Sequence, residues 1–182
     1  MPDYYAYALA VQDILALRSD TSNRDVEPIR AALDRWHASH WHIYLTMSDF
    51  AEIAAGAGHI DEISAIVEES LERAESNQEL WAFPEVLRVK GQLLLSRKEP
   101  DPDLAEEYFV RSLDRARAQG KPAWALRTAI SLALLKREQG QTDKGRELLQ
   151  IAYACFAEGL HTADLKRARR LLNELSRLQL FE

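Results

Sequence analysis

The sequence predicts an all-α protein in which antiparallel helix hairpins stack in a row, with about nine helices. Similar apolar patterns return about every 40 residues, most clearly in the segments that begin at Asp49, Val86 and Ile130. Glycine and proline are scarce, with 7 and 6 residues, and they separate the apolar segments. No segment alternates apolar and polar residues over the length of a strand. All the hairpins are expected to form one domain that spans residues 1–182.

The N-terminal half is predicted to form two hairpins, at about residues 4–39 and 41–75. The first helix, Tyr4 to Leu17, is apolar at nearly every position and therefore needs cover on several sides. The third helix is expected to end at Gly58, because a residue without Cβ suits a left-handed cap. The fourth runs from about Ile60 to Ala74. It has one apolar face, and its other face is acidic: Glu68, Glu69, Glu72 and Glu75.

Two further hairpins, at about 80–119 and 122–158, are followed by a capping helix at about 162–180. Gly120 and Gly140 are expected to end helices, and Asp103 with Glu106 has the spacing of a capping box. The last helix has an apolar stripe on one side. Its other side carries five basic residues: Lys166, Arg167, Arg169, Arg170 and Arg177. A half-charged final helix is what a helical stack needs to cover its end.

The composition excludes several classes of function. The formal net charge is −6 and is uneven, since residues 1–90 hold 7 Lys/Arg and 16 Asp/Glu (net −9), which leaves +3 for residues 91–182. An acidic chain is a poor nonspecific ligand for nucleic acid. The single cysteine, Cys155, permits no disulfide within the chain and suits a reducing compartment. The apolar runs are too short for a membrane span. We therefore expect a cytoplasmic protein without direct contact to nucleic acid or membrane.

Small residues recur where the two helices of a hairpin must approach closely. They are Ala51, Gly91 and Ala133 in first helices, and Ala105 and Gly145 in second helices. A bulky side chain there would push apart helix axes that lie about 8–10 Å from each other. Four residues after the second set, Phe109 and Leu149 fill the space toward the next hairpin. This pattern resembles the tetratricopeptide repeat, although the period is nearer 40 residues than 34 and the closing proline is missing. The resemblance implies a tetratricopeptide-like superhelix.

Three longer segments resemble a narrower family. They are "LWAFPEVLRVKGQLLLS", "DLAEEYFVRSLDRARAQGKPAWALRTAISLALLKREQG" and "YACFAEGLHTADLKRARRLLNEL". Together they are similar to the C-terminal repeat domain of bacterial signal-transduction ATPases, of the adenylate cyclase or winged-helix transcriptional regulator type, over about residues 80–176. The resemblance implies a sensory or regulatory platform without catalytic residues. The chain has no G-x-x-x-x-G-K-[ST] loop, so ATPase activity does not carry over.

No residue set predicts chemistry or a cofactor. The segment "WHASHWH" places His37, His40 and His42 within six residues, and two of them at i and i+3 could reach a metal. We favour the alternative that a helix ends there and the three rings point apart. Adjacent carboxylates such as Glu68 and Glu69 diverge on a helix and do not form a catalytic pair. We expect neither a metal site nor an enzyme.

The groove that first helices line in such stacks is the predicted binding surface. Its residues are expected to be Ser48, Glu52, Glu85, Arg88, Gln92, Arg127 and Arg137. Their mixed charge suits a peptide or an acidic ligand, and simple exposure to solvent is the alternative. The predicted function is a noncatalytic module for protein–protein interaction, the regulatory tail of a bacterial signalling protein. A domain that senses a ligand or peptide in the groove is the second interpretation.

The N-terminal helix predicts a second contact. Tyr4, Tyr5 and Leu9 make it apolar where the end of a stack is normally charged. We expect these residues to be covered by an upstream domain or by a second copy in a two-fold dimer.

Overall fold

A computed structural model describes residues 58–76, 81–158 and 161–178, together with the single residues Gln12, Ala51 and Ala55. In these ranges the chain forms six α-helices and no strand, which confirms the all-helical class for this part. The helices are α4 (Ile60–Ser76), α5 (Phe83–Ser96), α6 (Pro102–Ala118), α7 (Pro122–Glu138), α8 (Thr142–Tyr153) and α9 (Ala163–Leu178).

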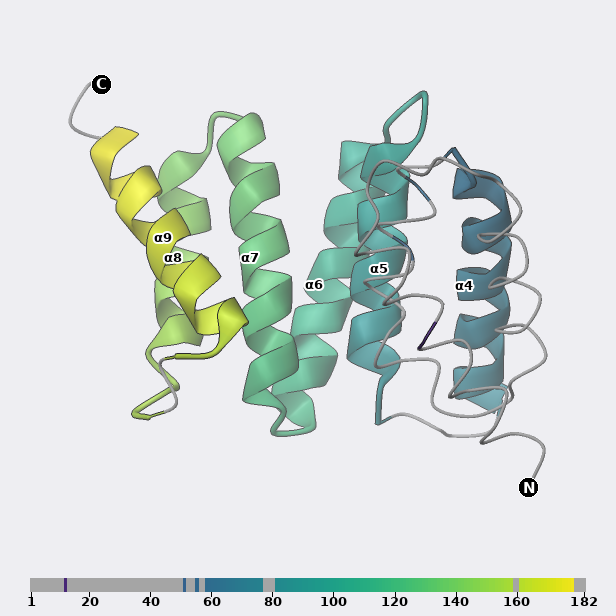
Figure 1. Cartoon of the computed structure of the whole chain (residues 1–182), viewed down its shortest axis with the longest axis horizontal. Helices are drawn as coiled ribbons and strands as arrows, with labels where there is room; N and C mark the ends of the chain where they lie inside the picture. The colour runs from purple at the N-terminus through teal and green to yellow at the C-terminus, as the bar shows by residue number, and fades with distance from the viewer. Residues whose placement is uncertain are drawn as a thin grey trace.

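The six helices follow one another in a row (Figure 1). Each helix packs on the next one in the sequence, and α7 in addition contacts both α5 and α9. Consecutive helices run in opposite directions, so α5, α7 and α9 point the same way. The described hairpins therefore follow one another in chain order.

Successive helices share separate apolar clusters rather than one central core. Phe83 and Leu87 of α5 pack on α4, and Phe109 of α6 packs between α5 and α7. A third cluster joins α7 to α8 and α9 through Leu149 and Leu165, among others. Helix α7 contributes to two clusters from different faces, so it is apolar around most of its circumference and lies in the middle of the stack.

The predicted crossing residues occupy the closest helix contacts. A Cβ placed on Gly91 of α5 would come within 2.5 Å of the Phe109 ring, and a Cβ on Gly145 of α8 would lie 2.9 Å from the carbonyl oxygen of Ala133. Both distances are shorter than van der Waals contact, so only glycine fits. Ala105 and Ala133 are fully buried. The sequence-based prediction of close crossings is confirmed at these positions.

Helix ends follow the predicted glycines. Gly58, Gly120 and Gly140 have φ values of 94°, 61° and 71°, the left-handed conformation that glycine adopts without strain. After Gly120 and Gly140 the chain forms Schellman caps, in which the amide of Lys121 donates to the carbonyl of Ala116 and that of Gln141 to Lys136.

Two predicted boundaries were wrong. Helix α6 begins at Pro102, and the carboxylate of Asp101 rather than Asp103 accepts the capping hydrogen bond from the Leu104 amide, at 3.0 Å. A helix start at Pro102 is favourable, because proline has no backbone N–H group and the first N–H of a helix would otherwise need a hydrogen-bond partner. Helix α8 ends at Tyr153, earlier than the hairpin end expected at about residue 158, and leaves Cys155 exposed.

Several predicted features lie outside the described residues. They are the N-terminal contact at Tyr4, Tyr5 and Leu9, the groove residues Ser48 and Glu52, and the histidines of "WHASHWH". Among the helices that are described, none combines the length and the apolar character needed to cross a lipid bilayer.

Candidate functional site

The candidate site is the groove between α5 and α7. Four residues of α5 spaced by three or four positions share one face, and four residues of α7 do the same. They are Glu85, Arg88, Gln92 and Ser96, and Arg127, Ser131, Leu134 and Glu138. Because α5 and α7 run in the same direction, the N-terminal ends of the two sets meet at one end of the groove and the C-terminal ends at the other.

A buried ion pair occupies the N-terminal end. Glu85 and Arg88, one turn apart on α5, are 1% and 5% exposed. The guanidinium of Arg88 donates from Nε to Oε2 of Glu85 at 2.8 Å and from Nη2 to Oε1 at 2.6 Å. This two-pronged geometry is the strongest arrangement of an arginine and a carboxylate. It allows both charges to remain buried inside a helical stack.

Arg127 of α7 joins this pair to α9. Its Nη1 lies 3.3 Å from Oε1 of Glu85, and its Nε donates to Oδ2 of Asp164 at 2.7 Å. Burial alone would lower the pKa of Arg127, but the bond to Asp164 and the charges of Glu85 and Asp164 raise it above the usual value. Asp164 lies in the first turn of α9, where the helix dipole favours a carboxylate. The charged network thus ties α5, α7 and α9 together.

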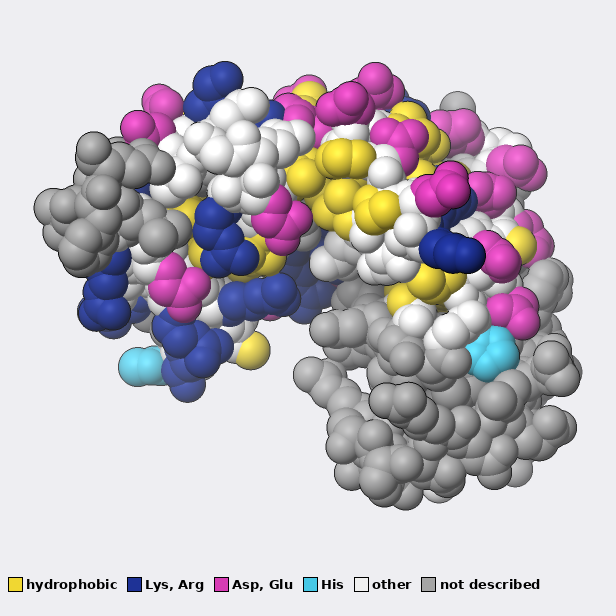
Figure 2. Space-filling view, turned by 90° about the horizontal axis from the view of Figure 1, so that it is seen from above, with side chains coloured by type: hydrophobic (Ala, Val, Ile, Leu, Met, Phe, Trp, Pro, Cys, Tyr) yellow, Lys and Arg dark blue, Asp and Glu magenta, His cyan; other side chains and the backbone are white. Residues whose placement is uncertain are grey.

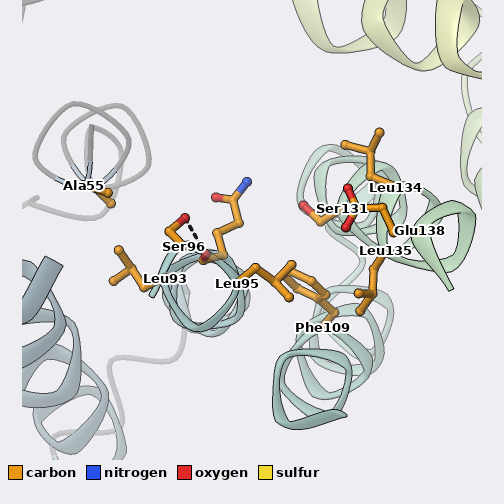
Figure 3. Close-up of a pocket in the computed structure, with 11 residues that line it drawn as sticks. Ala55, Leu93, Leu95, Ser96, Phe109, Ser131, Leu134, Leu135 and Glu138 are labelled. Carbon is orange, nitrogen blue, oxygen red and sulfur yellow. Dashed lines mark hydrogen bonds between the residues drawn. The ribbon is translucent and has the colours of Figure 1, made fainter. Parts of the chain in front are cut away.

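A pocket of about 490 Å³ occupies the C-terminal end. Its walls come from α5, α6 and α7, with Ala55 on the side of α5 that faces away from α7 (Figure 3), and Ala51 also lines it. Leu95, Phe109 and Leu135 lie between the helices, whereas Ser131, Leu134 and Glu138 line the side of α7. Gln92 and Ser96 complete the polar part of the lining.

The pocket is suited to binding rather than to reaction chemistry. Its wall is mainly apolar, and its polar groups include the amide of Gln92 and the hydroxyl of Ser131, which donates to the carbonyl of Arg127 and can still accept a hydrogen bond. A mainly apolar pocket with a few polar groups is the usual form of a site that holds an apolar side chain or a small ligand. Glu138 is the lining residue with a carboxylate, and it is exposed.

Four of the predicted groove residues lie on α5 and α7 at this site. Glu85, Arg88 and Arg127 form the charged network, and Gln92 lines the pocket. Glu85 and Arg88 face each other rather than solvent, so simple exposure does not describe them. Arg137 lies beside α9, with Nη1 3.8 Å from Oε2 of Glu174. Ligand binding at any of these residues stays a prediction.

Sequence reasoning missed Asp164 and the apolar wall of the pocket. The sequence contained a signal for one wall residue. Arg127 follows Glu85 by 42 residues, and both were predicted to line the groove; Leu134 follows Gln92 by the same 42 residues. Aligning the repeats at that offset would have placed Leu134 in the groove. Asp164 carries no comparable signal, since it reaches Arg127 from a neighbouring hairpin.

The described ranges contain no group of three His, Cys, Asp or Glu residues that could hold a metal ion. No protein-family model, curated protein or solved structure matches this chain. The function must therefore be argued from the geometry of the groove and from the resemblance in the sequence.

Proposed function

We propose that this chain is a noncatalytic, tetratricopeptide-like helical-repeat module that binds a segment of another protein in the groove between α5 and α7. The observation that carries the proposal is the pocket at the C-terminal end of the groove. It opens between two parallel helices of successive hairpins, and Leu95 and Leu134 in its lining keep part of their surface exposed.

The preferred partner is a peptide segment with one large apolar side chain. The pocket volume of about 490 Å³ accommodates such a side chain, and Gln92 and Ser131 provide hydrogen-bonding groups for the peptide backbone beside it. The charged side chain in its lining is the exposed Glu138, so the pocket does not require a strongly charged partner. The buried network of Glu85, Arg88 and Arg127 serves to hold the two helices in register.

The test is selection of binding peptides on the 182-residue chain. A displayed library of random peptides is panned on the protein, and binding is measured by fluorescence polarisation. Replacing Ser131 with leucine fills the pocket with a good helix former, so affinity should fall about tenfold or more, equal to about 1.4 kcal/mol.

The matched control is Ile151→Ser, at a side chain of α8 that is 52% exposed and lies outside the pocket. It should leave peptide binding unchanged. Failure to select any peptide, or equal binding by Ser131→Leu and the parent chain, would contradict the proposal.

A second candidate function is the sensing of a small apolar ligand, and the pocket's size favours it. Sites for small molecules have volumes of about 300–1,000 Å³, and this pocket falls in that range. A ligand that binds only the folded chain raises its melting temperature. A metabolite that stabilises the parent chain but not Ser131→Leu, and is not displaced by selected peptides, would favour this function.

The biological setting that we propose is the cytoplasmic regulatory or sensory tail of a bacterial signalling protein. It is supported by the resemblance over residues 80–176 to repeats that follow an ATPase domain. The coding sequence upstream of residue 1 tests it: an ATPase domain, preceded by a cyclase or winged-helix domain, is the expected result. An unrelated catalytic domain there would contradict this setting while leaving the groove proposal intact.

A further inference from the structure

The outer face of α9 carries a row of exposed cations. Lys166, Arg170 and Arg177 are spaced by four and seven residues, so they share one side of the helix. All three are exposed, and they lie opposite the buried residues Leu165 and Leu175. In the part of the chain that the structure describes, none of the three forms an ion pair. The two carboxylates of α9 are instead held by α7, since Asp164 binds Arg127 and Glu174 lies near Arg137.

The outer face of α4 carries the opposite charge. Asp61, Glu68 and Glu72 are exposed and are spaced by seven and four residues, opposite the buried Ile63 and Val67. Glu68 also accepts a hydrogen bond from Lys90 of α5, yet its side chain is still 55% exposed.

The two faces are complementary in spacing as well as in sign. Along α9 the three cations are separated by four and then seven residues, and along α4 the three anions by seven and then four. Each cation can therefore face one anion only when the two helices run antiparallel. In that register Lys166 faces Glu72, Arg170 faces Glu68 and Arg177 faces Asp61. The same register places Ala65 opposite Asn173, so a small residue lies at the centre, where two helices come closest.

We propose that α9 of one copy of this chain docks antiparallel on α4 of a second copy. Helices α9 and α4 lie at opposite ends of the described row (Figure 1). Seen from above, Lys and Arg gather at the α9 end, and Asp and Glu at the α4 end (Figure 2). The contact is therefore head-to-tail, and such contacts build rings or open chains rather than closed two-fold dimers. This assembly is independent of the groove proposal.

The association is expected to be weak and sensitive to salt. Exposed ion pairs contribute little individually, and their attraction is screened over about 10 Å at moderate ionic strength. In sedimentation velocity at about 20 mM NaCl, the average mass should rise with protein concentration, and at about 500 mM it should return to that of the monomer.

Charge reversal provides the decisive test. Lys166→Glu with Arg177→Glu should remain monomeric at low salt, and so should Asp61→Lys with Glu72→Lys. An equimolar mixture of the two variants should associate again, because the acidic α9 of one variant then meets the basic α4 of the other. Circular dichroism checks that each variant remains helical.

The control is Lys98→Glu with Lys121→Glu, which changes the net charge equally at two exposed positions outside both faces. It should associate like the parent chain. A parent chain that is monomeric at low salt overturns the proposal. So does association that persists in both charge-reversed variants, which would point instead to a contact such as the expected N-terminal two-fold dimer.

Discussion

The two ends of the groove between α5 and α7 use the same pair of parallel helices differently. At the N-terminal end, Glu85, Arg88 and Arg127 satisfy one another, and Glu85 and Arg88 leave almost no surface to solvent. At the C-terminal end the helices are separated by a pocket whose walls are apolar. The comparison teaches that ion pairs close the N-terminal end of the groove and join the repeats there. The C-terminal end stays open and can accept a ligand.

The same difference extends to the charged groups. The ion pair of Glu85 and Arg88 is buried, whereas the pair of Lys136 and Glu106, which joins α7 to α6, has a carboxylate that is 29% exposed. Buried charges must be paired, because an unpaired one is costly. Exposed pairs are screened by water and contribute much less. The charged end should therefore respond far more strongly to substitution than the open end.

The largest effect is expected for Glu85→Ala. Removing the carboxylate leaves Arg88 buried and unpaired, so the free energy of unfolding should fall by about 3–5 kcal/mol. Urea denaturation followed by circular dichroism measures it. Glu138→Ala, at an exposed carboxylate of the open end, should change stability by less than about 0.5 kcal/mol. Similar losses in both variants would contradict the contrast between the two ends.

Gly91→Ala should have the next largest effect. The new Cβ would lie 2.5 Å from the buried Phe109 ring, which forms part of the pocket wall. Overpacking of this kind costs about 1–3 kcal/mol, although alanine recovers about 1 kcal/mol of helix propensity.

A double-mutant cycle separates these two terms. Adding Phe109→Leu should relieve part of the Gly91→Ala loss, because a smaller side chain gives way. Gly145→Ala meets the backbone of Ala133 instead, so trimming a side chain offers no such relief there. A Gly91→Ala variant more stable than the parent chain would show that the close contact can relax.

Arg127→Met should cost less than Glu85→Ala. Glu85 keeps its bonds to Arg88, and Asp164 is 35% exposed and can be hydrated. We expect a loss of about 1–2 kcal/mol, at the low end of the range of about 1.5–3 kcal/mol for hydrogen bonds to charged groups, because the side chains of Arg127 and Asp164 are both about one-third exposed. Arg137→Met, which removes a contact at 3.8 Å, should cost less than about 0.5 kcal/mol. An equal effect of the two substitutions would mean that Arg127 does not join the three helices.

The smallest effect concerns acid stability at the open end. Burial alone would raise the pKa of Glu106, but hydrogen bonds from Lys136 and Gln139 outweigh it and lower the pKa below 4.5. A lowered pKa in the folded state stabilises the fold above the unfolded pKa, and this contribution is lost as the pH falls through the folded pKa. Because the carboxylate is partly exposed, we expect about 0.2–1 kcal/mol.

Glu106→Gln is the matching variant. It should be less stable than the parent chain at pH 7, and the difference should shrink below about pH 4. Denaturation curves across the pH range measure it. A difference that is constant with pH would show that ionisation of Glu106 does not stabilise the fold.

Much of the described fold could be predicted from local sequence features. Glycines with positive φ end helices because other residues are strained in that conformation, so Gly120 and Gly140 mark ends by themselves. Small residues at fixed spacing predicted the close crossings at Gly91 and Gly145. The start of α6 was misplaced by two residues because Asp101 and Asp103 are both acceptable caps, and the choice depends on Pro102.

The site was harder to predict. In the structure Glu85 and Arg88 are buried, Arg127 binds Glu85, and Gln92 lines the pocket. Helical spacing predicted all four as groove residues. It could not distinguish a buried ion pair from exposed charges, because both have the same spacing. The pocket required three helices to be placed in space, with Phe109 of α6 as a wall between Leu95 and Leu135.

The sequence by itself determined the six described helices and most of their ends, because caps and apolar spacing act within a few residues. Only the tertiary structure decided which charges became buried and where the groove stayed open. Glu85 meets Arg127 across 42 residues, and Arg127 meets Asp164 across 37. Burial and ion pairing of this kind depend on distances between helices, which a linear pattern does not contain.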